Sequence, residues 1–216
     1  MGAYALTAVF GYLLGSIPTG YVMARAKGVD IRKVGSGNIG ATNVMRILGR
    51  PLGILVLLFD AAKGWIACNG VPLLVLSMAG GAAGDGEPAT VNLAITGGIA
   101  AILGHNYTCW LRFKGGKGIA TSAGVMLGLA PMALLAALGI WIVVVVLSRY
   151  VSLGSIVAAA CLPFSVWWCG GSPQVVVVAA LLGALAIYKH RSNIQRLIQG
   201  TENRIGSQRR TQEHQG

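Results

Sequence analysis

A short polar segment early in the chain combines the residue types that bind phosphate. It reads Gly35-Ser36-Gly37-Asn38-Ile39-Gly40-Ala41-Thr42-Asn43, with Arg32 and Lys33 just before it and Arg46 just after it. Backbone N–H groups with cations nearby are what phosphate binding requires. The segment therefore predicts an anion site, and its candidate residues are Gly35, Ser36, Gly37, Asn38, Gly40, Thr42, Asn43 and Arg46.

Three further polar clusters follow along the chain. They are His105-Asn106 with Phe113-Lys114-Gly115-Gly116-Lys117-Gly118, then Ser148-Arg149-Tyr150-Val151-Ser152, and then Lys189-His190-Arg191-Ser192-Asn193. His190 and Asn193 are three residues apart and would share one face of a helix. Plain flexible loops and helix-end anchors are the alternative interpretation, and His105 could equally be a simple helix-end residue. We favour anion binding, because Lys117 stands among glycines as the polar side chains of the first segment do.

Several familiar motifs are absent or stand in the wrong context. Gly35 to Gly40 fits the dinucleotide pattern G-x-G-x-x-G, but an apolar run precedes it instead of a strand. Neither His105 nor His190 begins the His-x4-Asp motif of the soluble-type acyltransferases, and no Ser-His-carboxylate triad can be assembled. The four cysteines and three histidines show no paired metal spacing, so no metal is expected. The site suits an activated substrate such as an acyl phosphate, for which positioning and charge neutralisation suffice.

The elements that must position these clusters are membrane spans. Of the 216 residues 55% are hydrophobic and 11% are charged, and the mean hydropathy is +0.68. A spanning helix needs about 20 apolar residues. We expect an all-α, polytopic membrane bundle of about seven helices, at residues 3–24, 51–69, 91–110, 118–130, 132–148, 152–169 and 174–189. The first run lacks the basic start of a signal peptide and leads into the polar segment, so it is expected to remain a helix.

The net charge of +11 is distributed unevenly along the chain. Basic residues gather at 25–50, at 112–117 and from 189 onward, whereas Asp85 and Glu87 stand in a glycine-rich loop. If the spans alternate, every basic cluster falls on one side of the membrane, which the positive-inside rule assigns to the cytoplasm. We therefore expect the N-terminus outside, the C-terminus in the cytoplasm, and no nucleic-acid partner.

One charged pair lies inside a predicted span. Asp60 and Lys63 would each cost about 2.5–3.5 kcal/mol if isolated at mid-bilayer. Three residues apart on a helix, they can pair and neutralise each other. Their role is either this structural pairing or the orientation of the site.

The clusters taken together resemble the bacterial membrane family of acyl-phosphate:glycerol-3-phosphate acyltransferases, over nearly the whole chain. The motifs that carry the resemblance are Gly15-Ser16-Ile17-Pro18-Thr19-Gly20, residues 35–44 with Arg46, Phe113 to Thr121, Ser148 to Ser155, and Lys189 to Ile194, with Gly200 and Glu202 behind. The resemblance implies that Ser36, Arg46, His190 and Asn193 are catalytic. It also implies that the segment around Lys117 binds glycerol 3-phosphate, that seven spans carry a cytoplasmic site, and that Glu202 is structural.

The expected reaction is direct acyl transfer. The sn-1 hydroxyl of glycerol 3-phosphate attacks an acyl phosphate, giving lysophosphatidic acid and inorganic phosphate, the first step of bacterial phospholipid synthesis. His190 or a substrate phosphate could take the proton. The substrate-binding set is expected to include Gly35, Gly37, Asn38, Gly40, Thr42, Asn43, His105, Gly115, Gly116, Lys117, Gly118 and Ser152. No cofactor is expected, and the partners are these two substrates and membrane lipids, with no protein partner indicated.

Two other function classes compete with the enzyme. A transporter of phosphate or an organophosphate would also place cations and glycine-rich breaks in a helical bundle, but it should bind near mid-membrane with access from both sides. A lipid-binding scaffold would not need the set Ser36, His190 and Asn193. We expect an enzyme of the bacterial inner membrane, with a single catalytic domain at 1–200 and a polar cytoplasmic tail at 201–216.

Overall fold

The regular structure of the protein is helical. The computed structural model describes residues 1–78 and 87–206. Within these ranges the elements are α1 (Gly2–Ser16), α2 (Thr19–Ala26), η1 (Ile31–Lys33), α3 (Ala41–Leu48), α4 (Arg50–Met78), α5 (Glu87–Asn106), η2 (Cys109–Leu111), α6 (Ile119–Leu129), α7 (Pro131–Ser148), α8 (Val151–Trp168), α9 (Pro173–Lys189) and α10 (Arg191–Ile198). The predicted all-α class is thus confirmed; Asp85 and the end of the predicted tail, 207–216, lie outside the described residues.

Within the described ranges, four helical segments are long and apolar enough to cross a membrane. They are 2–26, 50–78, 131–148 and 151–168, and the pair α9 and α10, bent by 56°, would make a fifth. Helix α6, with 11 residues, is apolar but short. Each of the seven predicted runs contains a helix, and the chain is a multi-pass membrane protein.

The first predicted span, 3–24, lies within the candidate span 2–26, but it is not one continuous helix. It is divided into α1 and α2 at Ile17 and Pro18, because proline has no N–H to donate to the preceding turn and its ring obstructs the helix. The carbonyls released at this break find other donors: Thr108 Oγ1 hydrogen-bonds to the Ser16 carbonyl, and Lys63 Nζ lies 3.0 Å from the Ile17 carbonyl. The break is therefore tied to two distant segments.

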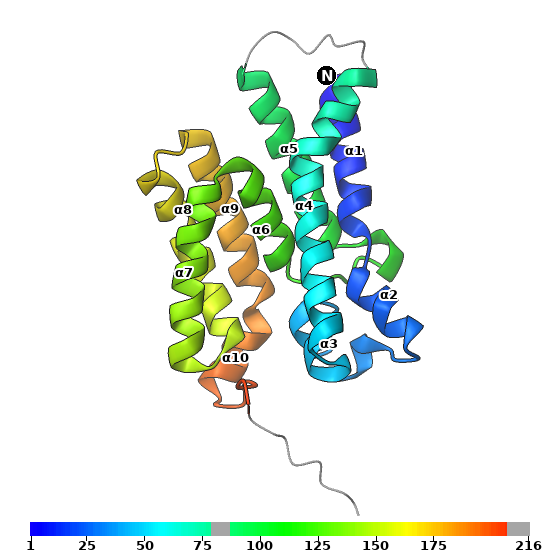
Figure 1. Ribbon diagram of the computed structural model, residues 1–216, viewed down its shortest axis with the longest axis vertical. Coiled ribbons are helices and arrows are strands. Elements are labelled where there is room, and N and C mark those ends of the chain that lie inside the picture. The colour runs from blue at the N-terminus through cyan, green and yellow to red at the C-terminus, as the bar shows by residue number, and fades with distance from the viewer. Residues whose placement is uncertain (79–86, 207–216) are drawn as a thin grey trace, which may run out of the picture.

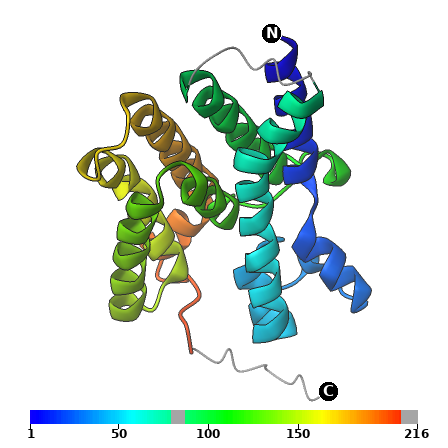
Figure 2. The same ribbon diagram turned by 45° about the horizontal axis from the view of Figure 1, so that its top comes forward.

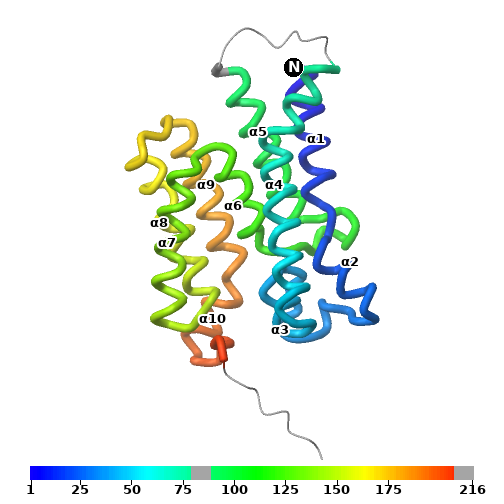
Figure 3. The backbone as a smooth tube through the Cα atoms, in the orientation of Figure 1, coloured from blue at the N-terminus to red at the C-terminus, as the bar shows by residue number. Residues whose placement is uncertain are grey.

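The helices form two groups joined by α6. Helix α1 packs on α4 and α5, while α8 packs between α7 and α9, and α6 contacts α4 most extensively. Figures 1 and 2 show the two groups side by side from both views. Between α5 and α6 the chain runs across the bundle beside the middle of α4 (Figure 3). The glycine-rich segment that includes Lys117 is thereby carried into the interior of the molecule.

Glycines set the close approach of α4 and α6. A Cβ added at Gly124 on α6 would overlap the Ala61 carbonyl oxygen, and one added at Gly64 on α4 would overlap the Thr121 carbonyl oxygen. Small residues that allow backbones to approach are favoured where helices pack in membranes. This contact brings the start of α6, which follows the glycine-rich loop, against the middle of α4.

The substitution Gly124→Val should separate these two helices. Extra volume forced into a packed interface costs typically about 1–3 kcal/mol, so we expect a lower thermal midpoint in detergent. Gly139→Val on α7 is the matched control, because a Cβ there has no heavy atom within 4 Å. Equal midpoints for the two variants would contradict this account of the interface.

Candidate active site

A polar cavity of about 310 Å³ lies between the two helix groups. Its wall comes from the loop before α3, from α4, α6, α7 and α8, and from the junction of α9 and α10. Its polar lining is formed by Ser36, Asn38, Gly40, Thr42, Asn43, Arg46, Asp60, His105, Lys117, Gly118, Ser152, Ser155, His190, Asn193, Glu202 and Asn203. The structure therefore brings together all the predicted site residues except Gly35, Gly37, Gly115 and Gly116.

The loop before α3 is shaped by its own side chains. Asn43 is buried, and its Nδ2 donates to the carbonyls of Val34 (3.1 Å) and Asn38 (2.9 Å). Its Oδ1 accepts the Ser36 N–H at 2.9 Å and Arg46 at 3.3 Å. Asn43 thus holds the loop that carries Ser36 and anchors one edge of the Arg46 guanidinium.

Two glycines outside the cavity wall let this loop turn. Gly35 and Gly37 have φ values of +61° and +70°, a region that residues with a side chain rarely adopt. The Asn38 Oδ1 then accepts the Gly40 N–H at 2.8 Å, immediately before α3 begins. The first turn of α3 lines the cavity, and a helix N-terminus is a favourable place for an anion.

The second glycine-rich loop is folded back on the end of α5. The N–H groups of Gly115 and Gly116 donate to the carbonyls of Asn106 (3.2 Å) and His105 (3.0 Å). A Cβ at Gly115 would overlap the His105 carbonyl oxygen, and one at Gly116 would overlap the His105 ring. These two glycines therefore do not line the cavity; they allow the close contact that presents Lys117 to it.

The Lys117 ammonium is the cation of this second loop. It donates to Asn193 Oδ1 on α10. Burial lowers the pKa of Lys117 to about 8, despite the opposing effect of the Glu202 carboxylate. The lysine is charged at neutral pH and close to titration.

Glu202 connects the chain beyond α10 to the cavity. Its Oε1 accepts Asn193 Nδ2 at 2.8 Å and Ser152 Oγ at 3.0 Å, and its Oε2 accepts Arg196 Nε at 2.6 Å. Burial acts to raise the pKa of Glu202, but these hydrogen bonds outweigh it and lower the pKa, so the carboxylate stays ionised. Asn193 is thus oriented from both sides, by Glu202 and by Lys117.

His190 faces the cavity as a neutral imidazole. Its Nδ1 lies 2.7 Å from the Ala186 carbonyl oxygen, which can only accept, so Nδ1 carries the proton. Burial, together with the charge of Lys117, lowers the pKa of His190 to about 4. Its Nε2 therefore keeps a lone pair at neutral pH.

The part of the tail that the structure describes takes part in the site. The Ile205 N–H donates to the Arg149 carbonyl at 2.9 Å, and the Arg149 guanidinium donates to the Ile205 carbonyl. This holds 201–206 against the bundle, with Glu202 and Asn203 in the cavity wall. Sequence reasoning took Glu202 as structural and did not consider Asn203, since polar residues after the last apolar run carry no signal of burial.

An apolar cavity of about 110 Å³ adjoins the polar one. The two share wall residues from α6, α7 and α8: Ile119, Ala123, Leu138, Trp141 and Ser155. Sequence reasoning missed the apolar wall, because apolar side chains that line a cavity look like those that face lipid. The combined space can hold an anionic head group beside an apolar chain.

Comparison with known proteins agrees with this geometry. Residues 5–200 match the family model described as glycerol-3-phosphate acyltransferase. The chain is 52% identical to the glycerol-3-phosphate acyltransferase of Geobacter sulfurreducens over 93% of its length and 96% of the relative, and 46% identical to that of Rhizobium meliloti over 92% and 90%.

Solved structures are similar throughout the chain. The glycerol 3-phosphate form of PlsY, an integral membrane glycerol 3-phosphate acyltransferase, has a TM-score of 0.81 at 40% identity, covering 94% of this chain and 96% of that one. Its lysophosphatidic acid form gives 0.79 at 39% identity, covering 94% and 95%. The matches extend through the helices that build the cavity, and the resemblance in the motifs is confirmed. The chain belongs to the glycerol-3-phosphate acyltransferase family.

Proposed function

We propose that the cavity transfers a fatty acyl group from an acyl phosphate to the sn-1 hydroxyl of glycerol 3-phosphate, releasing lysophosphatidic acid and inorganic phosphate. Acylation of glycerol 3-phosphate is the activity of the family. The observation that carries the proposal is a polar cavity, lined by Arg46 and Lys117, that shares wall residues with an apolar cavity. The related structures named for glycerol 3-phosphate and lysophosphatidic acid support the same acceptor and product.

Each loop is suited to one phosphate group. The phosphate of the donor would lie at the first turn of α3, beside Ser36, Thr42 and Arg46, where N–H groups and a guanidinium converge. The phosphate of the acceptor would lie beside Lys117 in the second loop, with Asn193 and Ser152 toward its glycerol. The acyl chain would then enter the apolar cavity beside Trp141.

The chemical step is a direct displacement. The sn-1 oxygen forms a bond to the acyl carbon, the bond between that carbon and the phosphate oxygen breaks, and phosphate leaves with the bonding electron pair. The hydroxyl proton passes to His190 Nε2 or to a substrate phosphate, whose second pKa is about 6. Among the residues the structure describes, no base hydrogen-bonds to Ser36 Oγ, which favours Ser36 as a ligand over Ser36 as a covalent nucleophile.

The orientation in the membrane follows from charge. Helices α1, α4, α5, α6, α7, α8 and α9 alternate in direction along the bundle, which is consistent with seven crossings (Figure 1). The short helices α2, α3 and α10 lie at the end of the bundle opposite the N-terminus and carry basic residues. By the positive-inside rule we assign this end to the cytoplasm, which places the site on that side of the bacterial inner membrane.

The function is tested by phosphate release from palmitoyl phosphate, with and without glycerol 3-phosphate, using purified protein in detergent. Release should require glycerol 3-phosphate and yield lysophosphatidic acid.

Arg46→Lys keeps the charge but loses the planar fork, so we expect kcat/KM to fall by roughly 10²–10³, as when a transition-state donor is removed. Arg50→Lys, at an exposed residue outside the cavity, is the control. Uptake of phosphate into liposomes without acylation would instead indicate a transporter.

The pH dependence of kcat/KM should reflect the deprotonation of Lys117. Because its pKa is lowered from 10.5 to about 8, the ammonium loses its proton as the pH rises through about 8, and kcat/KM for glycerol 3-phosphate should fall above that pH. Lys117→Arg stays charged across this range and should remove the alkaline fall, even if its activity is lower. The same alkaline fall in both proteins would contradict the assignment.

Glu202→Ala should weaken binding of the acceptor through Asn193. Without the carboxylate, Asn193 Nδ2 loses its partner and Lys117 loses a fixed acceptor. Since hydrogen bonds to charged groups contribute about 1.5–3 kcal/mol, kcat/KM for glycerol 3-phosphate should fall by roughly tenfold or more. Glu202→Gln keeps an acceptor oxygen and should lose less. Gln195→Ala, an exposed change on α10 close to Glu202 in the sequence, is the control. If Glu202→Ala behaves like Gln195→Ala, the proposed role of Glu202 is wrong.

A further inference from the structure

His105, in the last turn of α5, has one ring nitrogen bound to a lysine and the other beside the second glycine-rich loop. Its side chain is only 6% exposed and contributes to the cavity wall. Nδ1 lies 2.9 Å from Lys63 Nζ. Within residues 1–78 and 87–206, Nε2 has no hydrogen-bond partner, and it lies against Gly116, just before Lys117. A ring nitrogen without a hydrogen-bond partner among the described residues thus borders the second loop.

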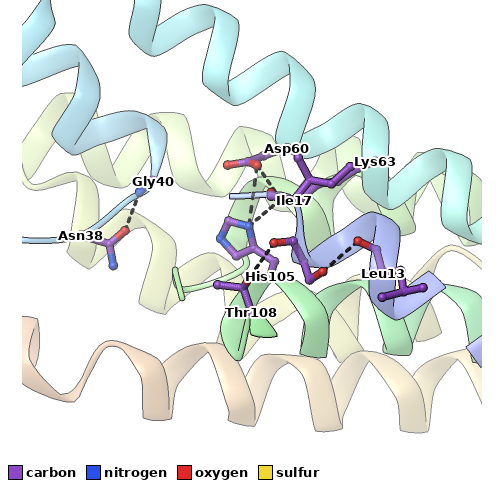
Figure 4. A network of polar contacts seen from close by, with 9 residues as sticks. Leu13, Ile17, Asn38, Gly40, Asp60, Lys63, His105 and Thr108 are labelled. Atoms are coloured by element: carbon purple, nitrogen blue, oxygen red, sulfur yellow. Dashed lines mark hydrogen bonds and ion pairs between the residues drawn. The ribbon is translucent and has the colours of Figure 1, made fainter. Parts of the chain in front are cut away.

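The Lys63 ammonium contacts His105 Nδ1 and two other groups. Its Nζ lies 2.7 Å from Asp60 Oδ1, 3.0 Å from the Ile17 carbonyl and 2.9 Å from His105 Nδ1 (Figure 4). Two of these contacts are hydrogen bonds and the third is an ion pair. An ammonium donates only, so a charged Lys63 satisfies both acceptors and the carboxylate. The adjacent Asp60 carboxylate supplies the opposite charge inside the membrane protein.

This contact determines where the His105 ring carries its proton. Because Lys63 can only donate, Nδ1 must accept, and a neutral imidazole then has its proton on Nε2. His190 is held in the other tautomer, since its Nδ1 donates to the Ala186 carbonyl. One histidine therefore offers the cavity an N–H donor and the other offers a lone pair.

We propose that Asp60 and Lys63 are positioning residues that fix the Nε2–H tautomer of His105, and that this N–H binds an oxygen of the glycerol 3-phosphate phosphate beside Lys117. The proposal rests on the proposed function for the identity of the anion. Beyond that function, the ion pair acts on the substrate only through His105, and we call this arrangement the relay.

The charges around His105 agree with an anionic ligand. Lys63 offsets the Asp60 carboxylate, which would otherwise repel a phosphate from this wall of the cavity. With Nδ1 occupied and Nε2 protonated, His105 cannot accept the hydroxyl proton during transfer. Of the two histidines in the wall, the role of base is thus open only to His190.

The tautomer is measured directly by nitrogen NMR on the full chain labelled with ¹⁵N-histidine. The sequence has three histidines, and the His105 signals are identified by their loss in His105→Gln. We expect the wild-type His105 signals to show a proton on Nε2 and a lone pair on Nδ1. In the double variant Asp60→Asn/Lys63→Met the two nitrogens should shift toward a mixture of tautomers. Wild-type signals with the proton on Nδ1 would overturn the proposal.

Kinetics then tests the link to the substrate. The double variant should raise KM for glycerol 3-phosphate by roughly tenfold, with KM for palmitoyl phosphate nearly unchanged. His105→Gln, which keeps an N–H₂ donor, should retain more activity than His105→Leu. Asn69→Ala, elsewhere on α4, is the control. An unchanged KM in a folded double variant, or equal losses in the two His105 variants, would refute the relay.

The two proposals fail in different ways. If wild-type protein does not acylate glycerol 3-phosphate, the proposed function fails, while the nitrogen signals still test the tautomer. If it acylates normally and the His105 signals or variants behave otherwise than expected, the relay alone fails. Should the double variant not fold, the wild-type signals and the comparison of His105→Gln with His105→Leu decide the matter.

Discussion

A charge inside a membrane protein must be matched by partners, and here the buried Lys63 ammonium draws its partners from three segments. It binds Asp60 one turn earlier on α4, the Ile17 carbonyl at the break of the first helix, and His105 at the end of α5. Removing one member of such a buried pair leaves an uncompensated charge, which is far more destabilising than replacing both members. This contact ties the end of α5 to α4, next to the second glycine-rich loop.

The two loops are held by the protein's own polar groups. Asn43 satisfies the backbone of the first loop, and the carbonyls of His105 and Asn106 satisfy that of the second. Groups fixed in advance do not have to be ordered when the substrate binds. For an acyl phosphate, which already carries its leaving group, fixed cations and N–H donors supply what the reaction needs.

The location of the site also explains how it can bind both a soluble and a lipid-like substrate. Because α5 ends beside the middle of α4 and α6 is short, the polar loop between them reaches into the bundle (Figure 3). The apolar cavity between α6, α7, α8 and α9 begins where the polar one ends. An acyl chain and its phosphate can therefore occupy neighbouring spaces of opposite character.

The helical membrane class, the family and the polar residues of the cavity could be predicted from the sequence, because long apolar runs and glycine-rich polar motifs are local features. Features that depend on partners far along the chain required the tertiary structure. It supplied Thr108 and Lys63 as donors to the Ser16 and Ile17 carbonyls, which the break at Pro18 leaves without helical partners. It also gave Glu202 its place beside Asn193, selected the apolar side chains that line a cavity, and fixed opposite tautomers for His105 and His190. A side chain's hydrogen-bond partner depends on which helices meet, and that is set by packing over the whole bundle.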